Sequence, residues 1–259
     1  MNKRPRRTIE HVLWIASFLL LWELIVSTGF VSELILPSLL DILRALVDDL
    51  VGGTLLLRIG VSLALVFGGM ILGTLFALIL SIVSYLFPLL ASGVEVLTSI
   101  AHPLPGIALL PLVILWFGTG TLSIFFIVIH AVLWPMVINF NAGFSSVNRT
   151  FLDIGRNYEY GRWGLIIHVL IPSSWSYMVA GLRIAWARSW RAVISAEMVF
   201  GVIGLYGGLG WYIFNKRVFM DTSGMYAGLL VLIIIGLVIE DILFKRIERR
   251  VKHSNGGAQ

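Results

Sequence analysis

The feature that most constrains this chain is the length of its uncharged segments. Asp, Glu, Lys and Arg are absent from three long runs, Ile59–Val94, Val96–Asn148 and Thr222–Ile239. A helix that crosses a bilayer needs about 20 apolar residues, so the first two runs can hold several crossings or long tilted helices. The chain is 58% hydrophobic and 13% charged, whereas soluble domains are about 25% charged. We therefore predict an all-α, polytopic membrane protein.

We expect a single membrane domain over residues 1–259, with about six transmembrane helices. An even number of crossings places both ends of the chain on the same side of the bilayer. Both ends are basic, and basic residues gather where spans meet the cytoplasm. We therefore expect residues 1–10 and 246–259 to be cytoplasmic tails. The expected spans are His11–Phe30, Ile59–Leu86, Gly106–Phe117, Thr121–Asn139, Ser174–Phe200 and Tyr226–Leu243.

One loop pulls weakly against this topology. The last loop, which the topology places outside, contains Lys216 and Arg217 against a single Asp221. The basic start of the chain also resembles that of a signal peptide. The apolar run that follows it is long and has no A-x-A-like cleavage site, so we interpret it as a retained span.

The charge distribution and the absence of known motifs exclude several classes of function. The net charge is +5, but the basic residues gather beside the expected spans, which favours a topological role over nucleic-acid binding. The chain has no cysteine and no G-x-x-x-x-G-K-[ST], H-E-x-x-H or G-x-S-x-G motif. We therefore predict that it is not an enzyme, needs no cofactor or metal and does not itself bind ATP.

Two segments between the expected spans have patterns of their own. Within Leu36–Leu50, apolar residues at helical spacing oppose Asp41, Arg44 and Asp48, which predicts an amphipathic helix at the outer membrane surface. Gly201–Phe214 carries five glycines. Such a segment is poorly suited to a helix, so we predict a tight re-entrant or loop segment packed against other protein.

The fifth expected span is unusual because it contains charged residues. Charge that faces lipid is costly, so these side chains are expected to face protein or water. They can line a solute pathway or gate, which favours an anionic or zwitterionic solute, or they can form internal ion pairs that hold helices together. Both interpretations stay open. Four charged side chains fall within about half of the helix circumference: Arg183, Arg188, Arg191 and Glu197.

A second charged segment, Phe151–Pro172, lies between the fourth and fifth expected spans. Four crossings from a cytoplasmic N-terminus return the chain to the cytoplasm just before it. The segment turns apolar and reaches a proline where the fifth span begins. Its tyrosines and its tryptophan are residue types enriched at interface hot spots, and they are Tyr158, Tyr160 and Trp163.

Several segments together resemble one family, the membrane permease subunits of binding-protein-dependent ABC importers. The resemblance is closest to its nitrate, taurine and aliphatic sulfonate branch, and it extends from about Leu36 to Arg250. The resemblance rests on the order and spacing of several segments. They are the charged segment described above, HPLPGIALLPLVILWFGTG, AVLWPMVINFNAGF, AGLRIAW followed by AEM, and GGLGW.

The resemblance assigns a role to the charged segment. The family has a cytoplasmic loop with the pattern EAA, three residues, glycine, nine residues and I-x-L-P. When Pro172 is aligned with its proline, Asp153 stands at the glutamate and Glu159 at the glycine. The family's loop helix sits in a groove of a separate ATPase, so residues 145–172 would form a coupling segment. The implied coupling residues are Asp153, Ile154, Gly155, Arg156, Tyr158, Glu159, Gly161 and Pro172.

Glu159 departs from the family pattern at a position where a left-handed backbone is easy only for glycine. We hypothesise that Gly161 takes over the turn and that the helix therefore runs slightly longer here.

The resemblance further implies a type I ABC importer permease-like fold in the bacterial plasma (inner) membrane. The implied partners are ABC ATPase subunits, an extracytoplasmic solute-binding protein and a second permease copy in a homodimer. ATP-driven closure of two ATPases would move two coupling helices and switch the spans between inward and outward access.

The main alternative is a secondary transporter driven by an ion gradient, which needs intramembrane carboxylates or broken-helix ion sites. Glu197 and Glu23 are the candidate carboxylates. An intramembrane enzyme is a weaker alternative, because no nucleophile or metal motif is present.

Overall fold

The computed structural model describes residues 3–202 and 207–247, and this part of the chain folds into helices without any strand. Three short segments depart from α-helical geometry: η1 (Gly106–Leu109) is a 3₁₀ turn, and η2 (Ile166–Leu170) and η3 (Ile239–Phe244) are π-helical. The α-helices are α1 (Lys3–Ser27), α2 (Leu39–Val51), α3 (Thr54–Leu86), α4 (Pro88–Ala101), α5 (Leu110–Phe117), α6 (Thr121–Ser145), α7 (Arg149–Asn157), α8 (Arg162–Leu165), α9 (Ile171–Ser173), α10 (Trp175–Phe200), α11 (Leu209–Val218) and α12 (Thr222–Val238).

The predicted membrane class and span number are confirmed. In the described residues, 4 helices are long and apolar enough to cross a bilayer alone, and they lie in α1, α3, α6 and α12. Two bent pairs of helices pass the same test of length and composition together, which gives up to 6 crossings when each pair is counted as one span. One pair joins α4 to η1 and α5 with a bend of 90°, and the other joins Arg162–Ser173 to α10 with a bend of 67°.

The third crossing starts earlier than the expected Gly106–Phe117. It begins at α4, and the chain breaks at the prolines between α4 and η1, where Pro105 is the N-cap of η1. Proline lacks the backbone N–H that would continue a helix, so the polypeptide turns there instead. Glu95 therefore lies within α4, and the uncharged run that follows it holds the rest of the broken span and the whole of α6.

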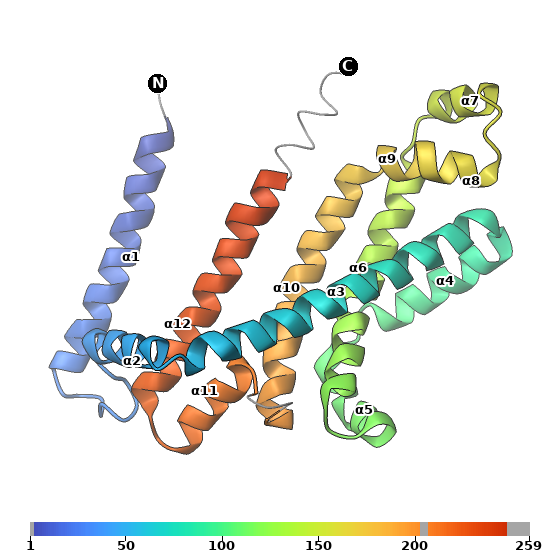
Figure 1. The fold of residues 1–259 in the computed structure, drawn as a ribbon. Helices are drawn as coiled ribbons and strands as arrows, with labels where there is room; N and C mark the ends of the chain where they lie inside the picture. Colours follow the sequence, from blue (N-terminus) through green and yellow to red (C-terminus); the bar gives the residue numbers. More distant parts are fainter. Residues whose placement is uncertain (1–2, 203–206, 248–259) are drawn as a thin grey trace.

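Figure 1 shows that the two ends of the bundle differ. The start of α1, the described end of η3 and the helices α7 and α8 lie at one end, which we call the α7 end. The helices α2, α5 and α11 lie at the other, which we call the α2 end. Both described chain ends therefore share a side with the charged segment, as an even number of crossings requires.

The core is built by α6, which packs against α3 on one side and α10 on the other. Small residues permit the close approach. A Cβ at Gly73 would lie 2.8 Å from Val132 Cβ, and a Cβ at Gly181 would lie 2.9 Å from Asn139 Cβ. Helices in lipid associate mainly through such close packing, because lipid tails are as apolar as leucine. The result is a tightly packed unit of α3, α6 and α10.

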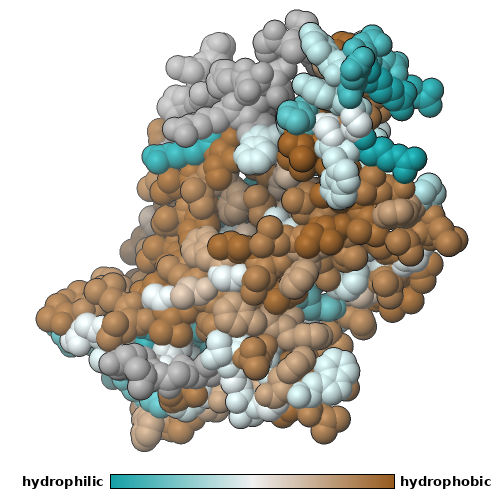
Figure 2. All heavy atoms as spheres, turned by 45° about the vertical axis from the view of Figure 1, so that its right-hand side comes forward, coloured by the Kyte–Doolittle hydropathy of each residue, from teal (hydrophilic) through white to brown (hydrophobic). Residues whose placement is uncertain are grey.

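The outer surface of the bundle is apolar. Figure 2 shows a broad brown band over the spans and hydrophilic side chains gathered at the α7 end. The helix α1 contributes many exposed apolar side chains, such as Phe18 and Leu20. It is fixed near its C-terminus, where Trp22 Nε1 donates to the Pro37 carbonyl (3.1 Å) and the indole packs edge-on against Tyr226. A lipid-facing surface of this kind is what a membrane subunit requires.

The two shorter predicted segments have different outcomes. The amphipathic helix forms as α2, with Ser38 as its N-cap. Ile42 is its buried side chain, while Leu40 and Leu43 are exposed at the bundle surface. The prediction that the glycine-rich segment is unsuited to a helix is wrong from Leu209 onward, because α11 begins there at the α2 end. Residues 203–206 of the segment lie outside the described residues.

Candidate functional site

The charged segment forms a short helix with defined caps at the α7 end. Asn148 is the N-cap of α7, and its side chain accepts a hydrogen bond from Thr150 N–H at 2.9 Å. At the other end, Tyr160 N–H donates to the Gly155 carbonyl (3.1 Å) and Glu159 N–H donates to the Arg156 carbonyl (2.9 Å). This pair of bonds is a Schellman motif, which closes a helix when the residue after its C-cap is left-handed.

The hypothesis that Gly161 takes over this turn is wrong. Glu159 itself has φ 57°, whereas Gly161 has φ −66° and an extended backbone. The helix therefore ends where the family glycine would end it, and it is not lengthened. A left-handed conformation costs a non-glycine residue about 1–2 kcal/mol. The two Schellman hydrogen bonds act against this cost.

The helix α7 is fixed to the segment that follows it through a close contact at Gly155. This glycine is buried, and a Cβ added to it would lie 2.7 Å from Leu165 Cδ2 and 3.1 Å from Val169 Cγ2. The Tyr160 ring stacks on His168, with 4.9 Å between the ring centroids. The helices α7 and α8 and the π-helical η2 therefore form one packed unit, which we call the coupling unit (residues 149–170).

The outward face of the coupling unit combines apolar and charged side chains. Ile154, Tyr158 and Trp163 are exposed, Tyr158 by 72%. Asp153 and Arg156 form an exposed ion pair of 3.2 Å. A surface pair of this kind contributes little to stability, so both groups are available to another protein. Exposed aromatic and aliphatic side chains with a charged rim are typical of an interface.

The coupling unit leads directly into α10. Pro172 lies in the first turn of α9, where its missing N–H is tolerated. Ser174, at the start of α10, is fully buried, and its hydroxyl donates to the Leu170 carbonyl at 2.7 Å. Gly143 of α6 packs against this serine, since an added Cβ would lie 2.7 Å from Ser174 Cβ. The coupling unit is therefore joined to the start of α10 by close packing and by a buried hydrogen bond.

The charged residues of α10 have different surroundings. Arg183 forms an ion pair with Glu240 of η3 at 3.0 Å, which is the internal pairing that the sequence left open. Arg188 Nη1 lies 3.4 Å from both the carbonyl oxygen and Nδ1 of His102. Arg191 is exposed, and its Nε donates to the Ala187 carbonyl of its own helix at 2.9 Å. Only Arg183 among these three joins a carboxylate in the described part of the chain.

Glu197 is enclosed by protein. Its residue exposure is 0%, and its carboxylate accepts hydrogen bonds from the Ser62 hydroxyl (2.8 Å) and the Gly210 N–H (2.8 Å). The Ser62 hydroxyl also accepts from Leu209 N–H at 2.8 Å. The carboxylate therefore joins α3 and α10 to the first turn of α11. Ser62 was missed by sequence reasoning, because a serine within an apolar run gives no signal of its partner.

Two adjoining clefts lie near the break in the third span, and the smaller of them is bordered by α10. The smaller, of about 320 Å³, is lined by both unpaired arginines together with His102, His130 and Ser195. The larger, of about 710 Å³, lies between α3, α4 and α6 and is lined by hydroxyl, amide, aromatic and aliphatic groups and by the carboxylate of Glu95. His102 and Pro103 line both clefts. The two histidines were not predicted as site residues, because isolated histidines are usually structural.

The order and spacing of these elements match a known family. Residues 69–253 match the family model described as binding-protein-dependent transport system inner membrane component. The chain belongs to this family. It is therefore a multi-pass inner-membrane permease, the transmembrane subunit of an ABC importer, as the resemblance implied.

Relatives of this permease match most of its length. The putative aliphatic sulfonates transport permease protein of Bacillus subtilis is 23% identical over 97% of this chain and 91% of its own. The taurine transport system permease protein of Escherichia coli is 24% identical over 95% of this chain and 89% of its own. The nitrate import permease protein of Synechococcus elongatus is 25% identical over 83% of this chain and 78% of its own.

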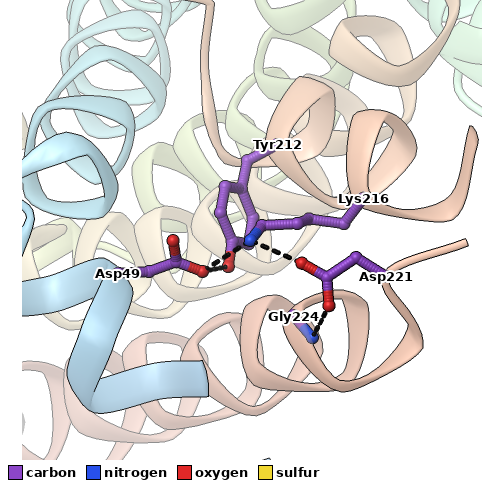
Figure 3. Close-up of polar contacts among 5 residues, drawn as sticks. All are labelled: Asp49, Tyr212, Lys216, Asp221 and Gly224. Atoms are coloured by element: carbon purple, nitrogen blue, oxygen red, sulfur yellow. Dashed lines mark hydrogen bonds and ion pairs between the residues drawn. The ribbon is translucent and has the colours of Figure 1, made fainter. Parts of the chain in front are cut away.

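The α2 end of the permease carries a polar network that the sequence did not reveal. Lys216 Nζ of α11 lies 2.9 Å from an Asp49 carboxylate oxygen and 2.7 Å from an Asp221 carboxylate oxygen (Figure 3). The Tyr212 hydroxyl donates to Asp49, and Asp221 accepts from Gly224 N–H at 2.9 Å at the start of α12. The lysine that weakly opposed the expected topology is thus neutralised by two carboxylates.

The same network shifts two pKa values in opposite directions. Burial by itself raises the pKa of Asp221, but hydrogen bonds from Lys216 and from Gly224 N–H outweigh burial and lower it. Burial by itself lowers the pKa of Lys216, but its bonds to Asp221 and Asp49 raise it. Both groups are therefore held in their charged forms around neutral pH.

Proposed function

We propose that this permease imports a small anionic or zwitterionic solute, such as a sulfonate, taurine or nitrate, and that a separate ATPase drives it. The relatives named for aliphatic sulfonates, taurine and nitrate support this class of solute. The cationic lining of the smaller cleft supports it independently, because Arg188 and Arg191 both face that cleft. Unpaired cations at membrane depth favour anions.

The observation that carries the proposed coupling is the packing of the coupling unit. A lever must be stiff and firmly joined to the part that it moves. Gly155 fixes α7 onto Leu165, and the unit continues into α10 through Pro172 and Ser174. The proposed ATPase-coupling residues are Asp153, Ile154, Gly155, Arg156, Tyr158, Glu159, Gly161 and Pro172, within residues 145–172.

The proposed topology follows from the two ends of the bundle. The α7 end faces the cytoplasm, where the ATPase binds, and both tails (residues 1–10 and 246–259) lie on that side. The α2 end faces outward, where a solute-binding protein delivers the solute. Two permease copies, each with one coupling unit, form the assembly. The basic residues beside α1 and after α12 support this orientation.

The charged residues of α10 divide into two proposed roles. Arg188 and Arg191 line the pathway, because both border the cleft beside the broken third span. Arg183 and Glu197 hold helices in place, because each is engaged by groups from other elements. In the alternating-access cycle, displacement of α10 would change the width of the cleft between α10 and η1.

The coupling role is tested by ATP hydrolysis and uptake measured together in proteoliposomes with the ATPase and the solute-binding protein. Arg156→Glu reverses an exposed charge, and Gly155→Trp forces α7 away from Leu165. We expect each variant to insert normally, to lose about tenfold or more of its uptake, and to hydrolyse ATP without matching transport. Normal uptake in both variants would exclude the assigned coupling role.

The source of energy is tested in the same vesicles. Uptake should stop when ATP is omitted and persist when ionophores collapse the ion gradients. Uptake that survives without ATP and disappears with the gradients would instead establish a secondary transporter.

A further inference from the structure

Two guanidinium groups in α10 lack an acidic partner in the described residues, 3–202 and 207–247. Arg188 contacts His102 through Nη1 alone, at 3.4 Å, which is the long limit of a hydrogen bond. Its Nε and Nη2 donate to no described residue. Arg191 engages its own helix through Nε. On the same helix, Arg183 forms an ion pair with Glu240 at 3.0 Å, so an arginine of α10 can reach a carboxylate.

The cleft beside these two arginines has the size and chemistry of a ligand site. Its volume of about 320 Å³ falls at the lower end of the range for small-molecule pockets, about 300–1,000 Å³. His130 lines the cleft, and its Nδ1 is buried without a hydrogen-bond partner. A buried polar atom without a partner is costly, so a ligand that satisfies it gains affinity.

The cleft also adjoins a polar route toward the α7 end. The larger cleft shares His102 and Pro103 with it and continues between α3, α4 and α6. Ser81 Oγ and Thr98 Oγ1 line that route and are likewise buried without partners, and the carboxylate of Glu95 lines it as well. Hydroxyl groups of this kind can donate to a passing anion without holding it as strongly as an arginine does.

We propose that Arg188, with Arg191 and His130, forms a binding site for the oxyanion group of the solute, a sulfonate or a nitrate, inside the permease. This inference rests on the proposed function and deepens it. The guanidinium of Arg188 presents parallel N–H groups that match two oxygens of one oxyanion. Arg191 adds positive charge at the exposed side of the cleft, and His130 adds a polar contact from α6.

The oxyanion that binds at this site could belong to either of two molecules, the solute or an anionic lipid with a phosphate group. Arg188 lies near the middle of α10 (Trp175–Phe200), whereas lipid headgroups lie at the membrane surface. The position therefore favours the solute, and the experiment below separates the two sources.

The chain has no cysteine, which permits a charge-sensitive probe of the cleft. Ser195→Cys places one thiol in the cleft of the full-length permease, held in zwitterionic phosphatidylcholine nanodiscs. The thiol is labelled with anionic methanethiosulfonate ethylsulfonate or with cationic methanethiosulfonate ethyltrimethylammonium. The ratio of the two labelling rates reports the electrostatic potential in the cleft. Slower labelling in the presence of ethanesulfonate or nitrate, which we call protection, reports that the anion occupies the cleft. A parallel sample contains phosphatidylglycerol in place of added solute anion.

We expect the anionic reagent to react faster, and Arg188→Gln to lower the rate ratio by about tenfold or more. Arg188→Gln should also abolish the protection of the thiol by ethanesulfonate. Arg183→Gln, a control on the same helix at a residue that does not line this cleft, should leave that protection intact and change the rate ratio much less. Arg188→Lys should keep much of the rate ratio but lose protection, because lysine cannot contact two oxygens in parallel.

Two results would overturn the inference. In the first, neither the ratio of labelling rates nor the protection of the thiol changes in Arg188→Gln or in Arg188→Lys. The other is protection that requires phosphatidylglycerol and is not produced by ethanesulfonate or nitrate, which would assign the site to a lipid phosphate. The measurement uses neither ATP nor the ATPase. Its failure therefore leaves the coupling proposal standing, and a failure of coupled uptake leaves this measurement valid.

Discussion

Glu159 adopts a backbone conformation that its side chain disfavours. Its φ of 57° is the left-handed value that a Schellman motif needs at this position. The family pattern has glycine here, and replacing that glycine kept the turn rather than moving it to Gly161. The fixed contacts on either side, Gly155 on Leu165 and Tyr160 on His168, explain why the turn could not shift along the chain.

The first prediction concerns this strain. Glu159→Gly removes the left-handed penalty and should stabilise the end of α7 by about 1 kcal/mol. The measurement is hydrogen exchange at the Tyr160 and Glu159 amides, whose bonds close the helix. Gly161→Ala is the control, since Gly161 has ordinary φ and open space around its Cβ position. Slower exchange in Gly161→Ala but not in Glu159→Gly would contradict the assignment of the strain.

At the scale of elements, α10 connects the coupling unit to both the cleft and the buried Glu197. Its first turn is anchored at Ser174, its middle carries Arg188, and its last turns carry the carboxylate that accepts from Ser62 and Gly210 N–H. One helix therefore links events at the α7 end to the position of α11 at the α2 end (Figure 1). This arrangement suits a lever whose movement must reach both faces of the membrane.

The second prediction concerns Ser62. Ser62→Ala removes a donor to Glu197 and an acceptor of Leu209 N–H, and should destabilise the permease by about 1–3 kcal/mol. The measurement is thermal unfolding in detergent. Ser81→Ala is a matched control on the same helix, because Ser81 is equally buried but its hydroxyl has no partner. Equal losses in both variants would show that burial, and not the hydrogen bonds of Ser62, sets the cost.

The third prediction concerns pH at the α11–α12 turn. The pKa of Asp221 is lowered in the folded protein. Its stabilising contribution is therefore complete above the ordinary carboxyl pKa and is lost as the pH falls through the lowered pKa. Protection of Gly224 N–H against hydrogen exchange, corrected for intrinsic rates, should fall between about pH 5 and pH 2.

Asp221→Asn is the control for this titration. It should give weaker protection of Gly224 N–H that no longer changes with pH over the same range. A pH dependence that persists unchanged in this variant would assign the titration to another group.

At the scale of the whole molecule, the two ends of the bundle are chemically distinct. The coupling unit and both described chain ends share one end, and α2, α5 and α11 share the other (Figure 1). Hydrophilic side chains gather at the α7 end beyond the apolar band (Figure 2). The bundle thus presents a polar surface to soluble partners on the proposed cytoplasmic side.

The fourth prediction tests that orientation with single cysteines in this cysteine-free chain. Arg156→Cys should react with a membrane-impermeant maleimide only after cells are permeabilised. Met220→Cys, at an exposed turn of the α2 end, should react in intact cells. The reverse pattern of labelling would invert the proposed topology.

The sequence by itself determined the membrane class and the approximate spans, and the family resemblance added the short helix at the α7 end. These follow from local properties, because a backbone in lipid must satisfy its own hydrogen bonds and uncharged runs of sufficient length form helices. The charges at the chain ends and the order of the family segments added the expected topology. The expected third span was placed too late, at Gly106, whereas the structure begins it at α4, before the prolines.

Only the tertiary structure decided how the polar side chains are matched. Arg183 and Arg188 are five positions apart on one helix and look equivalent in sequence, yet one meets Glu240 and the other meets a cleft. Lys216 meets Asp49 from a helix far away in the chain (Figure 3). Such matches depend on how each helix is rotated and translated against its neighbours. The close packing at small residues fixes that arrangement, and local composition does not encode it.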